Sequence, residues 1–105
     1  MISFKQFLAE ADDPIWDEQI VDRLKYVAQT GIIISLMGVI EKAFPHLSFR
    51  ETRDPCCAAL LHLRNIGKLN IRFGGKPWSN FDPDDFTFAQ RQAFNRMVML
   101  GKKYL

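Results

Sequence analysis

The sequence predicts a small, mostly helical α+β domain of about four helices and a small β element, preceded by a short amphipathic N-terminal helix. Apolar residues recur at helical spacing in several stretches, one run alternates strictly between apolar and polar residues, and a polar break follows the first ten residues. With 105 residues, 48% of them hydrophobic and 25% charged, the chain is long enough for one globular domain. We therefore assign residues 1–10 to a targeting or docking peptide and residues 11–105 to a single globular domain.

The first ten residues predict a two-turn amphipathic helix. Ser3 and Gln6 have the spacing of a capping box, in which each side chain bonds the other residue's backbone N–H. The acids Asp12 and Asp13 and then Pro14 interrupt the pattern. So short a helix is marginal alone in water, so we expect it to order when its apolar face docks on a partner. Three residues at i, i+3 and i+4 form this docking face: Phe4, Phe7 and Leu8.

The next two stretches read as helices. From about residue 14 to 29, apolar residues from Trp16 onward lie on one side and charged residues on the other, with Thr30 and Gly31 at the end. Residues 32–44 are ambiguous, because the run of isoleucines at the start suits a strand while the later apolar spacing is helical. We favour a largely buried helix there, capped by Thr30 and ended by Pro45.

Two further helices are predicted from Asp-Pro pairs. Asp54 and Pro55 read as the cap and first residue of one helix, with Gly67 just past its end. Asp82 caps the other in the same way, two more acids follow in its first turn, and Gly101 with two lysines ends it.

The predicted β element rests on alternation. Residues 68–73 place Leu69, Ile71 and Phe73 on one side and polar residues on the other, and two glycines follow as a turn. Residues 46–51 could form a second short strand, with Leu47 and Phe49 on the same side.

The polar side of the 68–73 run is the most suggestive internal surface. Residues 50–76 are locally basic, although the net charge of +2 is too small to argue for nucleic acid by itself. Bases beside an exposed aromatic ring can follow a nucleic-acid backbone and stack on a base. The alternative is a solvated strand face with the tryptophan folded onto the core. The predicted contact residues for a nucleic acid or protein partner are Lys68, Asn70, Arg72, Lys76 and Trp78.

We find no convincing catalytic or metal site in the sequence and expect no cofactor. Cys56 and Cys57 fit two small buried hydrophobic residues at a helix start, with a thiolate activated by that start as the alternative. His62 is five residues from Cys57, a poor spacing for a shared helix face, and it reads as structural. The acids at positions 82, 84 and 85 are better explained as caps than as cation ligands.

The chain also shows neither a secretory signal nor a membrane span. The longest uncharged run, residues 26–40, is too short and too polar to cross a bilayer. We therefore expect an intracellular protein without a membrane partner.

The run Phe4-Lys5-Gln6-Phe7-Leu8-Ala9-Glu10-Ala11 resembles the capsid-targeting peptide of internal head proteins in T-even-type bacteriophages. In that family the prohead protease cuts after Glu in a Leu/Ile-x-Glu context. The resemblance therefore implies a processing site at Glu10–Ala11, with Leu8 as the upstream anchor. It covers about a tenth of the chain and implies nothing about the fold of the remainder.

The resemblance implies a non-enzymatic protein that resides in the virion interior and then in the host cytoplasm. Its partners would be the capsid scaffold or prohead protease, and later a host defence or takeover target. Two alternatives remain. In the first, the N-terminal segment is a plain amphipathic helix that closes over the core. In the second, the protein is a cytoplasmic phage or bacterial module that binds a protein or nucleic acid through the Lys68–Trp78 face.

Overall fold

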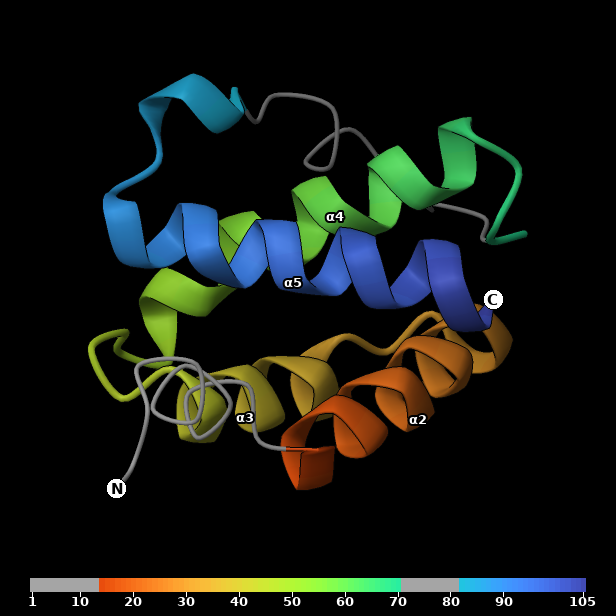
Figure 1. The fold of residues 1–105 in the computed structure, drawn as a ribbon, viewed down its shortest axis with the longest axis horizontal. Coiled ribbons are helices and arrows are strands. Elements are labelled where there is room, and N and C mark those ends of the chain that lie inside the picture. The colour runs from red at the N-terminus through yellow and green to blue at the C-terminus, as the bar shows by residue number, and fades with distance from the viewer. Residues whose placement is uncertain (1–13, 71–81) are drawn as a thin grey trace, which may run out of the picture.

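The computed structural model describes residues 14–70 and 82–105. Over these residues the backbone is mostly helical, and the elements follow one another along the chain without a described strand (Figure 1). The four α-helices and two 3₁₀ turns are α2 (Pro14–Thr30), α3 (Ile34–Ala43), η1 (Arg50–Thr52), α4 (Arg53–Asn65), η3 (Pro83–Asp85) and α5 (Phe88–Tyr104).

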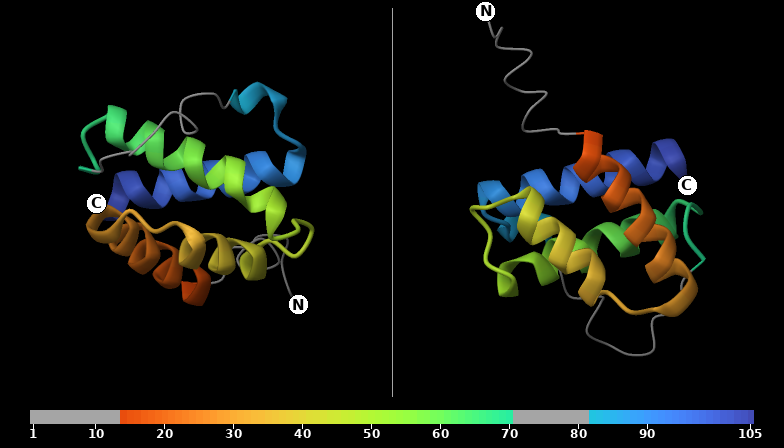
Figure 2. Two further views of the ribbon diagram at one scale, coloured as in Figure 1. Left: turned by 180° about the vertical axis from the view of Figure 1, so that it is seen from behind. Right: turned by 90° about the horizontal axis from the view of Figure 1, so that it is seen from below.

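Helices α4 and α5 lie side by side and run in the same direction (Figure 1). Near their starts, Gln90 Nε2 donates a hydrogen bond of 3.0 Å to the Glu51 carbonyl oxygen. Near their ends, Gly101 packs directly against Leu63. Helices α2 and α3 form a hairpin that packs across this pair (Figure 2). Two helix pairs therefore enclose one core between them.

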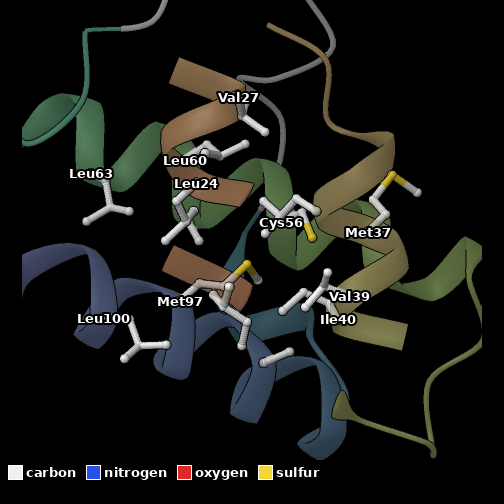
Figure 3. Close-up of a cluster of buried hydrophobic side chains, with 14 of the residues drawn as sticks. Leu24, Val27, Met37, Val39, Ile40, Cys56, Leu60, Leu63, Met97 and Leu100 are labelled. Carbon is white, nitrogen blue, oxygen red and sulfur yellow. The ribbon is translucent and has the colours of Figure 1, made fainter. Parts of the chain in front are cut away.

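The core contains buried side chains from all four helices (Figure 3). Ile20, Leu24 and Val27 of α2 are buried, as their spacing predicts. A side chain of this size stabilises a fold by roughly 1.5–3 kcal/mol when fully buried. The other large side chains with at most 2% exposure are Leu36, Ile40, Leu60, Leu63, Met97 and Leu100.

The α+β class is wrong for the part of the chain that the structure describes. Residues 68–70 do not form a strand but complete the end of α4. The Lys68 N–H donates to the Leu63 carbonyl at 2.8 Å, the Gly67 N–H donates to the Arg64 carbonyl at 3.0 Å, and Gly67 has a φ of 81°. This pair of bonds is a Schellman motif, which turns Leu69 inward. The alternation thus begins with a helix exit; residues 71–73 lie outside the described range.

The short strand predicted for residues 46–51 is also wrong. A turn is followed by η1, which continues into α4. Ser48 and Glu51 form reciprocal side-chain bonds, of 3.2 Å from the Glu51 N–H to Ser48 Oγ and 3.0 Å from the Ser48 N–H to Glu51 Oε1. The Ser-x-x-Glu spacing is a capping box, and it starts a helical segment where alternation suggested a strand.

Both Asp-Pro pairs lie close to helix starts without being those starts. The N-cap position of α4 is Thr52, so Asp54 falls in the first turn. Asp82 does act as a cap, since its Oδ1 accepts the Asp84 N–H at 3.0 Å, but the element it caps is only η3. Helix α5 begins afresh at a second capping box between Thr87 and Gln90, and it continues through Gly101 to Tyr104.

The ambiguous stretch after α2 is helical from Ile34 onward. Gly31, with a φ of 74°, ends α2, and its N–H donates to the Val27 carbonyl. The predicted cap Thr30 accepts the Ile32 N–H at 3.2 Å and donates to the Tyr26 carbonyl. The N-cap residue of α3 is Ile33, which makes no side-chain capping bond. Thr30 therefore serves the end of α2 and not the start of α3.

Candidate functional site

Most of the site residues predicted from the sequence lie outside the described ranges. This applies to the processing site at Leu8, Glu10 and Ala11 and to the docking face of Phe4, Phe7 and Leu8. It also applies to three residues of the predicted basic face: Arg72, Lys76 and Trp78.

Lys68 and Asn70 are the described members of the basic face. Both are exposed, while Leu69 between them is only 7% exposed. The inside–outside pattern expected of the first three residues is therefore present, but the Schellman motif produces it. The prediction that this surface binds nucleic acid stays a prediction.

The two cysteines are buried at the start of α4 and form no disulfide. Burial raises the pKa of the Cys56 thiol well above its usual range, and it raises the pKa of Cys57 to about 11. For Cys57 the neighbouring Arg53 opposes this rise and Asp54 adds to it. Both groups are therefore protonated near neutral pH, which argues against the activated thiolate and favours the structural interpretation.

The other candidate reactive groups have structural contacts. The His62 ring packs edge-on against Phe94, with ring centroids 6.2 Å apart. Asp84 Oδ1 lies 3.4 Å from Arg91 Nη2, an exposed pair on the α5 side of η3. Across residues 14–70 and 82–105, His, Cys, Asp and Glu side chains do not gather into a group of three that could hold a metal ion.

One recess among the described residues is an open groove of about 660 Å³ between the start of α2, the end of α3 and the middle of α5. We call it the Trp16 groove. Its volume falls within the roughly 300–1,000 Å³ common among ligand pockets. It is lined by Trp16, Lys42, Ala43, Phe44, Pro45, His46, Ala89, Gln92, Asn95, Arg96 and Met99.

An ion pair fixes one side of the Trp16 groove. Arg96 binds Asp17 through two parallel bonds, one of 2.8 Å from Nε to Oδ1 and the other from Nη2 to Oδ2. Both side chains are partly buried, at 16% and 24% exposure, so the pair ties α5 to the first turn of α2. Beside it, Met99 is 45% exposed. The groove thus combines an apolar surface with polar edges.

A second recess lies on the other side of Asp17, along the exposed face of α2. Half of its lining residues are acidic, and Tyr104 contributes to it from the end of α5. It is lined by Asp17, Glu18, Val21, Asp22, Lys25 and Tyr104. This recess therefore carries three acids and one lysine.

Sequence reasoning missed the Trp16 groove. It assigned Trp16 to the buried stripe of α2, and Met99 belonged to no predicted stripe at all. The sequence did contain one signal for this surface: Met99 is an apolar residue that lies outside the apolar stripe of its own helix. Its partners come from three separated parts of the chain, residues 16, 42–46 and 89–99, and only the packing of α2 and α3 on α5 brings them together.

In comparisons with known proteins, no protein-family model, curated protein or solved structure matches this chain. Within the described residues, each helix is too short or too polar to cross a membrane.

Proposed function

We propose that this chain is a small, non-enzymatic bacteriophage protein that is packaged in the virion head through residues 1–10. It is then ejected with the genome and acts on a host defence or takeover target. The observation that carries this proposal is the Phe4–Ala11 run, whose Leu8-Ala9-Glu10 segment resembles a prohead protease site.

The position of the run relative to the body supports removal of the peptide. Helix α2 begins at Pro14, so a cut at Glu10–Ala11 falls before the first described helix. The described core draws its residues from α2 to α5. Cleavage would therefore sever no described helix. The removed residues carry one lysine and one glutamate, so the net charge would not change.

The body has features that suit a binding protein. The Trp16 groove offers an apolar surface with polar edges. A host target would bind the body after ejection, and the capsid scaffold would bind residues 1–10 before it.

Mass spectrometry of purified virions tests this proposal. We expect the packaged chain to begin at Ala11. Leu8→Ala and Glu10→Gln should each prevent the cut, because they remove the anchor and the carboxylate at the bond. Glu18→Gln, at an exposed glutamate without a Leu or Ile two positions before it, is the matched control and should leave processing intact. Virions that hold only full-length chain, or none, would refute the proposal.

The alternative is a cytoplasmic module that binds through the Lys68–Trp78 face. It predicts a chain that keeps Met1 in the cell and binds nucleic acid with a steep dependence on salt, because phosphate contacts release counterions. Lys68→Glu combined with Arg72→Glu should then abolish binding while the helical circular dichroism spectrum is unchanged. An absent gel shift at low salt excludes nucleic acid as the ligand of this face.

A further inference from the structure

The Trp16 groove has the chemistry of a receptor for one short amphipathic helix. Trp16, Phe44 and Met99 give it an apolar surface, and Lys42 and His46 stand on the α3 side. Grooves of this kind bind helices through apolar anchors at i, i+3 and i+4. A volume of about 660 Å³ is enough for a few side chains and not for an extended interface.

The chain itself carries a segment with this pattern. Phe4, Phe7 and Leu8 are spaced as such anchors. The acids that follow them, Glu10, Asp12 and Asp13, are complementary in sign to Lys42.

The segment is also attached beside the groove. It joins the body at Pro14, and Trp16 lies in the first turn of α2, on the groove wall. The five residues between Leu8 and Pro14 span up to about 17 Å when extended. A tether this short gives an effective concentration on the order of millimolar. Even an interaction that would be weak between separate molecules is then populated within one chain.

We propose that the Trp16 groove is the docking site for Phe4, Phe7 and Leu8 of the same chain. A two-turn helix is costly to order, so the docked state is weak and reversible, and a scaffold can compete for the same three side chains. Docking within the chain does not require processing. One consequence does rest on the proposed function: a cut at Glu10–Ala11 releases the peptide and leaves the groove open for the host target.

Methyl NMR of the full-length chain, with ¹³C-labelled methionine, tests the proposal directly. Met99 lies on the groove, whereas Met37 is 6% exposed in the core and serves as an internal control. We expect nuclear Overhauser effects from the rings of Phe4 and Phe7 to the Met99 methyl that vanish in the Phe4→Ala, Phe7→Ala double variant, whereas any effect from Phe44, which also lines the groove, should remain. The Met99 signal should shift in that variant while the Met37 signal stays in place. An unchanged Met99 signal in a folded double variant would overturn the proposal.

A variant on the groove side gives an independent measurement. Met99→Asp places a negative charge in the groove at a half-exposed position, so the fold should tolerate it, while the charge opposes both the apolar anchors and the acids that follow them. We expect a glutamate-specific protease to cut after Glu10 several-fold faster in Met99→Asp than in the unchanged chain. Ile34→Asp is the matched control, since Ile34 is 65% exposed and does not line the groove. Equal rates in all three proteins would contradict docking in the groove.

The same experiments separate the remaining outcomes. If the Met99 shift grows with protein concentration, the segment docks on a second copy and docking within the chain is refuted. If virions contain Ala11-terminated chains while Met99 does not respond to the double variant, the proposed function stands and this inference fails. If Met99 responds while virions hold only full-length chain, this inference stands without the processing.

Discussion

Helix α5 makes two contacts of opposite character, one with α4 and one with α2. The contact with α4 is apolar and close, because Gly101 packs against the fully buried Leu63. Against α2 the Asp17–Arg96 ion pair joins the helices, and a recess opens on each side of it. Close packing leaves no room for a ligand, whereas recesses lie beside the α2–α5 contact. The first contact therefore stabilises the fold, and the second is where a partner is proposed to bind.

The largest effect should come from the α4–α5 contact. Leu63→Ala should lower the free energy of unfolding by about 2–5 kcal/mol, because it removes a fully buried side chain and leaves a cavity. Chemical denaturation of the variant measures this loss. A loss below about 1 kcal/mol would show that the contact is looser than its geometry indicates.

Gly101→Ala tests the same contact from the other side. A Cβ at position 101 would lie within 3.0 Å of three side-chain atoms of Leu63, so overpacking should cost about 1–3 kcal/mol. In the double variant with Leu63→Ala, the added methyl group enters the space that leucine leaves. The two losses should then be clearly less than additive. Gly38→Ala, with open space around its Cβ position, is the control and should not lose stability.

An intermediate effect is expected at the helical segment that leads into α4. Ser48→Ala removes one bond of the capping box and should cost about 0.5–2 kcal/mol, whereas Asp54→Ala should cost less because Asp54 caps nothing.

Bonds from Ser48 lower the pKa of Glu51 below its usual 4.5. Their stabilisation is therefore present above pH 4.5 and is lost as pH falls through the lower folded value. Thermal melts at pH 7 and pH 3 should show that Ser48→Ala loses less stability on acidification than the unchanged chain does.

The α2–α5 contact should be less sensitive. Asp17→Asn keeps the shape of the side chain and removes the charge, and we expect a loss on the order of 1 kcal/mol that shrinks as salt is raised. Glu18→Gln on the exposed face of α2 should change stability by less. If Asp17→Asn cost as much as Leu63→Ala, the ion pair would be a main determinant of the fold and the distinction between the two contacts would fail.

Ionisation of the buried thiols should have no effect on stability near neutral pH, where they are protonated in both the folded and unfolded chain. The pKa of Cys57 is about 11 in the fold against 9.0 for an unperturbed thiol. Stability is therefore full below pH 9 and falls as pH rises towards 11, since only the unfolded chain releases the proton. Cys57→Ala should reduce this alkaline loss in urea melts at pH 7 and pH 10. An identical alkaline loss in the variant would show that Cys57 is not its source.

The sequence by itself determined the helices and their buried faces. The apolar spacing of α2 places Ile20, Leu24 and Val27 in the core, because a period near 3.6 leaves only one face that can be buried. It also contains both capping boxes, at Ser48–Glu51 and Thr87–Gln90, although the prediction places the helix starts at the Asp-Pro pairs.

Two features depend on the tertiary structure: the conformation of residues 68–70 after α4, and the Trp16 groove. Alternation over three residues is shared by a strand and by a Schellman exit, and the position of the core beneath Leu69 is what distinguishes them. The groove joins residues more than seventy positions apart, such as Trp16 and Met99. Their proximity depends on how α2 and α3 cross α5, and no local pattern encodes a crossing of helices that are distant in the sequence.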